Sequence, residues 1–216
     1  MDKAVIFDLD GVIVDTAKYH FKAWQNVAKK LGFTFTNEQN ETLKGVSRVQ
    51  SLEILIELSG KNISEEEKET LLVSKNEEYL TFVAEMKADE ILDGIVDVLN
   101  YLDSNKIKYA LGSASKNAPL ILKKVGLYER FQAIVDGNDV SKGKPNPEVF
   151  LIAAKKLSIK PENCIVVEDA FAGVEAANRA NMLSIGIGAQ EILHHADIIL
   201  KDTSKLTTKL LKSILM

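Results

Sequence analysis

Six short runs of apolar residues, many of them β-branched, constrain the fold of this 216-residue chain more than any other feature. The runs are continuous rather than alternating, as expected for strands of a parallel sheet that is covered on both faces. They cover residues 3–7, 109–112, 133–135, 164–167, 184–187 and 198–200. Helical patterns lie between them, at residues 94–102, 118–125, 147–157 and 170–180. This alternation predicts an α/β fold with a Rossmann-like parallel sheet, whose functional site lies at the carboxyl ends of the strands.

Residues 15–87 interrupt the alternation. They contain three helical patterns, at residues 17–31, 49–59 and 64–83, and no convincing strand. The sequence therefore predicts a small helical cap domain of residues 15–87, inserted after the first strand of a core domain formed by residues 1–14 and 88–216. Because the insertion begins close to a strand end, we expect a lid that closes over the site, with hinges near residues 15–16 and 87–88. A rigid second packing layer is the alternative.

Composition narrows the possible partners and location. The net charge of −4 argues against nucleic acid as a main partner. No apolar run is long enough to cross a bilayer, so we expect no membrane partner. Cys164 is the only cysteine, which excludes an intrachain disulfide. The first residues lack the pattern of a signal peptide, which predicts a cytoplasmic protein, and we expect it to be a monomer.

The strongest chemical signal is the pair Asp8 and Asp10, which directly follows the first predicted strand. Two carboxylates at the end of a buried strand are costly unless a cation or a reaction requires them. In an extended chain both side chains can face one site. There Asp8 can attack phosphorus, and Asp10 can exchange a proton with a hydroxyl group. The same spacing occurs in calcium-binding loops, but the apolar residues 12–14 do not supply the further oxygen ligands that such loops need.

A second carboxylate pair, Glu168 and Asp169, follows another apolar strand. Together with Asp8 and the backbone carbonyl of Asp10, it would offer the hard oxygen ligands that Mg²⁺ prefers. Such an ion would shield Asp8 from the negative charge of a phosphoryl group. Taken alone, an acidic pair at this place is often only the cap of the following helix. The two pairs together predict Mg²⁺ as the cofactor.

Two further segments at strand ends carry groups that suit phosphate. Residues 113–117 begin with small hydroxyl residues just before a helical pattern, where they can bind phosphate oxygens. Taken alone, Ser113 and Ser115 more often serve as a helix N-cap. Farther along, Lys142 or Lys144 can neutralise a nucleophilic aspartate and a transferring phosphoryl group. The residues alone do not decide between the two lysines. The bond before Pro145 is a candidate for the cis form.

The four segments, in this order, resemble the motifs of the haloacid dehalogenase superfamily over the whole chain. The resemblance implies that Asp8 is the nucleophile and Asp10 the general acid and base. It implies that Ser113 binds phosphate and that Lys144 is the charge-balancing lysine. The expected magnesium ligands are Asp8, Asp10 through its backbone oxygen, Glu168 and Asp169. The helical insertion is similar to the small cap domain of that superfamily.

Within the superfamily, the first half of the chain resembles the mutases that interconvert β-glucose 1-phosphate and glucose 6-phosphate through a bisphosphate. The similar stretches are residues 8–24, 43–48, 51–52 and 113–117. The resemblance implies a sugar phosphate as the small-molecule partner, with Thr16 supporting the hinge and Asn76 adding a cap contact. The implied binding residues are His20, Trp24, Lys44, Gly45, Val46, Ser47, Arg48, Ser51, Lys75, Ser113, Ala114, Ser115, Lys116, Asn117 and Lys144.

Other interpretations of these residues remain open. Ser47 also fits a helix N-cap, His20 a helix-surface residue and Trp24 a hydrophobic core position. For the whole protein, a sugar-phosphate phosphatase of the same fold would use Asp8 in the same way. It would differ from a mutase only because water, instead of a sugar hydroxyl, attacks the aspartyl phosphate. A catalytically silent binding protein is disfavoured by the intact set of motifs.

Overall fold

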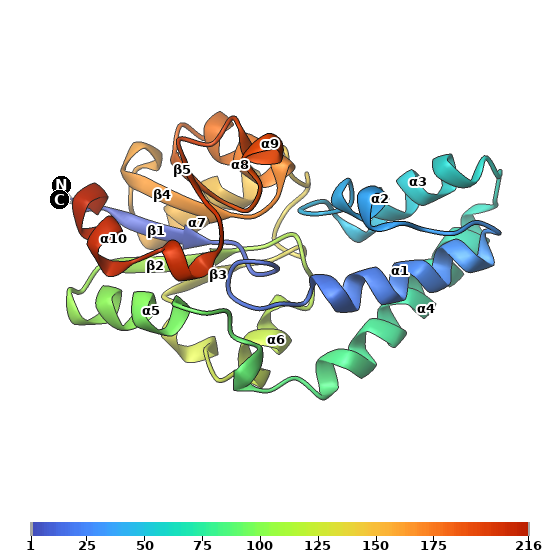
Figure 1. Ribbon diagram of the computed structural model, residues 1–216, viewed down its shortest axis with the longest axis horizontal. Helices are drawn as coiled ribbons and strands as arrows, with labels where there is room; N and C mark the ends of the chain where they lie inside the picture. The colour runs from blue at the N-terminus through green and yellow to red at the C-terminus, as the bar shows by residue number, and fades with distance from the viewer. Residues whose placement is uncertain (1, 216) are drawn as a thin grey trace.

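The computed structural model describes residues 2–215, and in that range the six apolar runs form one parallel sheet (Figure 1). The order of the strands across the sheet is β3-β2-β1-β4-β5-β6. Neighbouring strands pair in parallel throughout, so their carboxyl ends meet at one edge. The strands are β1 (Ala4–Phe7), β2 (Lys108–Gly112), β3 (Ala133–Val135), β4 (Cys164–Glu168), β5 (Leu183–Ile187) and β6 (Ile198–Leu200). The predicted α/β fold is confirmed.

Both faces of the sheet are covered, which explains why the strands read as continuous apolar runs. Val5 and Phe7 of β1 join one buried cluster with residues of helices α5 (Ile95–Ser104), α6 (Ala118–Lys124) and α10 (Thr208–Leu215). Ala4 and Ile6 point to the other face and join a second cluster with α7 (Glu148–Leu157) and α8 (Phe171–Arg179). Strands β1 to β4 therefore contribute apolar side chains to two cores, whereas β5 and β6 contribute to the first alone.

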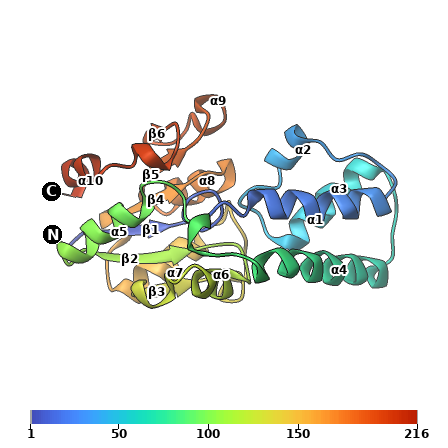
Figure 2. The same cartoon turned by 60° about the horizontal axis from the view of Figure 1, so that its bottom comes forward.

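Four helices form the insertion between β1 and β2, and they pack around a cluster of their own. They are α1 (Ala17–Lys30), α2 (Asn37–Glu41), α3 (Arg48–Ser59) and α4 (Glu65–Ala84). Ser47 and Ser64 begin α3 and α4 with capping boxes. Figures 1 and 2 show these helices beyond the carboxyl ends of the strands, at the opposite end of the molecule from both termini.

The remaining elements are short connections. They are the 3₁₀ turns η1 (Ala88–Glu90), η2 (Tyr128–Arg130), η3 (Pro161–Asn163) and η4 (Thr203–Lys205), and helix α9 (Gln190–Leu193). No helix in the described range is long and apolar enough to cross a membrane. The bond between Lys144 and Pro145 is cis, which confirms that hypothesis.

Candidate active site

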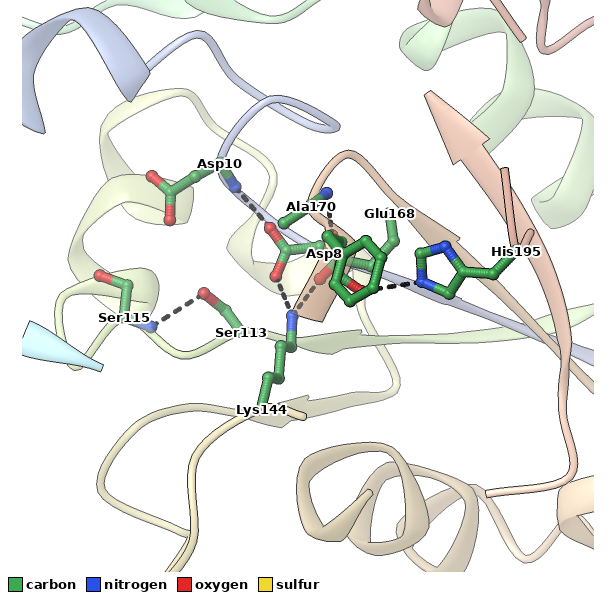
Figure 3. A network of polar contacts seen from close by, with 9 residues as sticks. Asp8, Asp10, Ser113, Ser115, Lys144, Glu168, Ala170 and His195 are labelled. Carbon is green, nitrogen blue, oxygen red and sulfur yellow. Dashed lines mark hydrogen bonds and ion pairs between the residues drawn. The ribbon is translucent and has the colours of Figure 1, made fainter. Parts of the chain in front are cut away.

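Asp8, Glu168 and Lys144 meet at the carboxyl edge of the sheet (Figure 3). Asp8 follows β1, Glu168 is the last residue of the neighbouring strand β4, and Lys144 lies in the loop before α7. Lys144 Nζ donates to Asp8 Oδ1 at 2.6 Å and to Glu168 Oε1 at 2.5 Å. Lys144 is only 1% exposed, whereas Lys142 is exposed to solvent. The structure thus decides between the two candidate lysines.

The charges of this group depend on one another. Burial alone would lower the pKa of Lys144, but the carboxylates of Asp8 and Glu168 outweigh it and raise that pKa above its ordinary value. Burial raises the pKa of Asp8 to about 7, with Glu168 and Asp10 adding to the rise and Lys144 opposing it. A buried lysine that stays protonated therefore helps to keep the proposed nucleophile ionised.

Asp10 occupies the same cavity as Asp8 but directs its carboxylate elsewhere. Its backbone N–H donates to Asp8 Oδ2 at 2.9 Å, while its carboxylate accepts a hydrogen bond from the Thr16 hydroxyl. His20 Nε2 lies 3.6 Å from Asp10 Oδ1. Burial favours a higher pKa for Asp10, but His20, Thr16 and Lys75 outweigh it and hold the pKa below its ordinary value. Asp10 is therefore ionised and able to accept a proton.

The chain turns sharply after Asp10, and Gly11 permits the turn. Gly11 has φ +81°, a left-handed conformation that favours glycine. A Cβ at this position would also overlap the carboxylate of Asp169. The glycine therefore lets the first strand end approach the second carboxylate pair.

Three carboxylates, from Asp8, Glu168 and Asp169, offer oxygens within 4.8 Å of one another. Burial, then the charges of Glu168 and Asp8, raises the pKa of Asp169 well above its ordinary value. The single positive charge of Lys144 cannot balance the negative charge of three carboxylates, and hard oxygen donors at such spacing suit a divalent cation. The donor set therefore fits the metal that the sequence predicts. Glu168 already accepts from Lys144 and from the backbone N–H of Ala170, so its free capacity is smaller than that of Asp169.

The loop after β2 contributes polar groups beside the carboxylates. Ser113 is fully buried, and its hydroxyl oxygen accepts from the backbone N–H of Ser115 at 3.1 Å (Figure 3). The N-cap of α6 is Asn117, so the interpretation of Ser113 and Ser115 as its N-cap is wrong. Ala114, Ser115, Lys116 and Asn117 line the cavity described below. Ser113 does not line it, and its hydroxyl group holds the backbone of this loop through Ser115.

A cavity of about 500 Å³ separates the sheet edge from the cap. On the cap side, the cavity is lined by the loop before α3, by the first turn of α3, and by residues of α1 and α4. From the predicted set these are His20, Trp24, Lys44, Gly45, Val46, Ser47, Arg48, Ser51 and Lys75. Asp8, Asp10 and Asp169 line the core side. Thr16 and Lys144 do not line it but bond Asp10 and Asp8, which do. Glu168 does not line it either, and its hydrogen-bond partners are Lys144 and Ala170.

A compact group on α1 and α4 faces Asp10 from the cap. Lys75, only 2% exposed, has its Nζ 2.7 Å from His20 Nδ1, 4.7 Å from the centre of the Trp24 ring and 4.8 Å from that of Tyr79. Burial, reinforced by Arg48, lowers the pKa of Lys75 to about 7. Burial and Lys75 also lower the pKa of His20. With Nδ1 accepting from Lys75, the proton of the neutral ring lies on Nε2, facing Asp10.

Tyr79 belongs to this group, and the sequence analysis missed it. Its ring stacks on His20 with the centroids 4.1 Å apart, and its buried hydroxyl has no hydrogen-bond partner within residues 2–215. Tyr79 lies four residues after Lys75 on α4, so both side chains share one helix face. That spacing was the available signal. Asn40, Leu72, Gly137 and Gly143 also line the cavity without having been predicted.

Several contacts join the cap to the core across the cavity. Asn117 Nδ2 of the core donates to Asn76 Oδ1 of the cap at 3.0 Å, and both residues line the cavity. Lys44 Nζ lies 4.0 Å from Asp169 Oδ2. Both contacts run from the helical insertion to the core beside the cavity.

Comparisons with known proteins agree with this geometry. The family model of haloacid dehalogenase-like hydrolases matches residues 3–181. The β-phosphoglucomutase of Bacillus subtilis is 42% identical over 97% of this chain and 93% of its own length. A phosphorylated carbohydrates phosphatase of Thermotoga maritima is 32% identical over 83% and 82%. A crystal structure of β-phosphoglucomutase from Clostridium difficile matches with a TM-score of 0.95 and 42% identity, covering 100% of this chain and 97% of that one.

Proposed function

This chain belongs to the haloacid dehalogenase-like hydrolase family, and from that membership we propose that it is an isomerase with β-phosphoglucomutase activity. It interconverts β-glucose 1-phosphate and glucose 6-phosphate through an aspartyl phosphate and a glucose 1,6-bisphosphate. The observation that carries the proposal is a cavity that has the nucleophile Asp8 on its core side and cationic side chains on its cap side. Lys144 lies beside Asp8 on the core, and Lys44 and Arg48 line the cap side.

A mutase needs this arrangement because its bisphosphate carries a phosphate at each end. While one phosphoryl group reacts with Asp8, the other must be held across the cleft. Arg48 suits that task because a guanidinium group can donate two parallel hydrogen bonds to a phosphate. Lys75, with its pKa lowered to about 7, gains a proton readily when a phosphate dianion enters the cap.

The reaction proceeds in two matched half-reactions. In the first, the C6 hydroxyl of β-glucose 1-phosphate attacks the phosphorus of phosphorylated Asp8. The Asp8 Oδ–P bond breaks, and Asp10 takes the hydroxyl proton. The bisphosphate then turns over in the cavity. In the second, the Asp8 carboxylate attacks the phosphorus on C1, the P–O1 bond breaks, and Asp10 returns the proton to O1. His20 and Thr16 orient the Asp10 carboxylate for both transfers.

We propose Mg²⁺ as the cofactor, held by the carboxylates of Asp8, Glu168 and Asp169 and the backbone oxygen of Asp10. When bound, it supplies positive charge that balances the carboxylates and the phosphoryl oxygens. Lys144 contributes to the same balance through its bond to Asp8. Because one chain supplies every group of the site, we propose a monomeric enzyme, acting on phosphorylated sugars in the cytoplasm.

The second candidate is a sugar-phosphate phosphatase, since the Thermotoga maritima relative bears that kind of name. The cap residues that line the cavity favour the mutase, because a cap that closes on a bound sugar would hold its far end and exclude water from Asp8. A coupled assay that detects glucose 6-phosphate tests the proposal. The protein, Mg²⁺, β-glucose 1-phosphate and a trace of the 1,6-bisphosphate should yield glucose 6-phosphate over many turnovers. Absence of glucose 6-phosphate at any protein concentration would overturn it.

A further inference from the structure

The cap meets the core at Gly143, in the loop that carries Lys144. A Cβ placed on Gly143 would lie 2.8 Å from Gln50 Oε1 and 3.7 Å from the Cβ of Ser47, both from the cap. Ordinary van der Waals contact to a Cβ begins near 3.4 Å, so a methyl group fits here only if the Gln50 amide shifts. We refer to this approach of Gln50 to Gly143 as the closure contact.

Gln50 is exposed to solvent, but its side-chain amide has a structural role. Its side-chain Oε1 accepts from the backbone N–H of Ser47 at 3.2 Å, and the backbone N–H of Gln50 donates to the Ser47 hydroxyl at 3.3 Å. These two bonds form the capping box that begins α3, immediately beside Arg48. Displacing Gln50 would therefore disturb the segment that carries the proposed distal phosphate ligand.

The backbone of Gly143 does not itself require glycine. Its φ lies outside the left-handed region, unlike that of seven other glycines in the described range. An alanine at position 143 is therefore free of backbone strain. The space taken by Gln50 is the physical reason for a residue without a side chain at this position.

A second close approach lies beside the metal-binding carboxylates. A Cβ on Gly45, in the cap loop, would lie 2.7 Å from the Cβ of Ala170, which follows Asp169. The cap loop thus touches the core both next to Lys144 and next to Asp169. Both contacts depend on small residues, so the distance to which the cap closes is set by their size.

We propose that Gly143 is a specificity-determining residue, because its missing side chain allows the closure contact that keeps water from phosphorylated Asp8. The inference rests on the proposed function. Where the cap is not fully closed, a water oxygen attacks the phosphorus and the Asp8 Oδ–P bond breaks. Inorganic phosphate then leaves, and Asp8 is again a free carboxylate. Gly143 and Gln50 together then set the partition of the phosphoryl group between sugar hydroxyl and water.

The test compares Gly143→Ala with the double variant Gly143→Ala/Gln50→Ala, in which the obstructing amide is removed. The readout is the ratio of inorganic phosphate to glucose 6-phosphate formed from β-glucose 1-phosphate. The methyl group must displace the Gln50 amide, and with it the capping box beside Arg48, by roughly half an ångström, and a 1 Å misplacement can cost about 100-fold in rate. We therefore expect the ratio to rise about tenfold in Gly143→Ala. Removing the Gln50 amide should bring the ratio most of the way back.

Lys142→Ala is the matched control, since Lys142 lies in the same loop, is exposed and does not line the cavity. It should leave the ratio unchanged. A wild-type ratio in Gly143→Ala would overturn the proposal. So would a raised ratio that Gln50→Ala fails to restore, because the effect would then come from the Lys144 loop itself.

A separate readout distinguishes failure of this inference from failure of the proposed function. Trp24 is the only tryptophan and lines the cavity, so its fluorescence reports occupation of the closed cap by glucose 6-phosphate. If the wild type releases only inorganic phosphate, the mutase proposal fails. The closure contact would still predict that Gly143→Ala needs more glucose 6-phosphate for the same fluorescence change, and that Gln50→Ala reverses this. Identical titrations of the three proteins would contradict it.

Discussion

At the residue scale, one buried lysine stands between two carboxylates that end adjacent strands. Lys144 bonds both Asp8 and Glu168, and its charge lowers the cost of ionising Asp8 in a buried place. The residues of this arrangement come from three distant parts of the chain. Its chemistry depends on Asp8 being a carboxylate, since an amide oxygen is a poor nucleophile.

Asp8→Asn should abolish phosphoryl transfer, with the rate falling by about 10⁴-fold or more, as for other enzymes that lose their nucleophile. The measurement is turnover of β-glucose 1-phosphate in the presence of the bisphosphate. Circular dichroism should show an intact fold. Turnover within tenfold of the wild type would remove Asp8 from the nucleophilic role.

Asp10→Ala should reduce turnover by about 10²- to 10⁴-fold, the usual contribution of a general acid and base. Because Asp10 is partly exposed in the cleft, and its carboxylate accepts a hydrogen bond from Thr16 and lies near His20, the fold should survive. Burst kinetics can separate transfer from the later steps. A near-normal rate of transfer to the sugar hydroxyl would exclude Asp10 as the proton carrier.

At the element scale, helices α3 and α4 deliver cations to the cavity in different ways. Arg48 is the first residue of α3, and Ser47 fixes its position with a capping box. Lys75 lies in the middle of α4, buried between two aromatic rings. The first cation is held at a helix start near solvent, and the second is enclosed by the cap.

Arg48→Ala should lower kcat/KM for the mutase reaction by about 10- to 100-fold, the cost of one or two hydrogen bonds to a charged group. Hydrolysis of acetyl phosphate, which has no second phosphate, should change little. Arg179→Ala is the control, since Arg179 is exposed on α8 and pairs with Glu175. Equal losses for both substrates would show that Arg48 does not bind the distal phosphate.

The buried amine of Lys75 should make stability depend on pH. Its pKa is lowered from 10.5 to about 7 in the folded protein, so the unfolded chain binds more protons between these values. The free energy of unfolding, relative to Lys75→Met, should therefore rise with pH by up to about 1.4 kcal/mol per unit from about pH 7 to pH 10.

Urea unfolding of both proteins at several pH values measures this difference. The same substitution at Lys29, exposed on α1, serves as the control and should show no such slope. A flat difference between the wild type and Lys75→Met would mean that Lys75 keeps its proton in the folded protein.

At the scale of the whole molecule, the strands were the most predictable part. Each is an apolar run, the central ones are buried on both faces, and each lies where the sequence placed it, within about one residue. Helix α2 was missed because its sequence is entirely polar, with only the Thr36 and Gln39 capping box as a signal. Helices α9 and α10 were missed as well, since α9 has only four residues and α10 follows the last strand near the chain end.

Site residues that lie close together in the sequence could be predicted, whereas those brought together only by the fold could not. Asp8 and Asp10 could be predicted because two aspartates stand two residues apart directly after an apolar strand. The choice of Lys144 over Lys142 required the fold, because only one of them reaches Asp8. Gly143 and Gln50 could not be recognised, since their role arises from two segments that are distant in sequence and meet when the cap closes.

The central claim is that phosphorylated Asp8 passes its phosphoryl group to a sugar hydroxyl instead of water. Phosphorus NMR of the wild-type protein with Mg²⁺, β-glucose 1-phosphate and a trace of the 1,6-bisphosphate measures both fates in one sample. We predict that the glucose 1-phosphate signal is replaced by glucose 6-phosphate, with little inorganic phosphate. Accumulation of inorganic phosphate without glucose 6-phosphate would contradict the account and identify a phosphatase that uses the same Asp8.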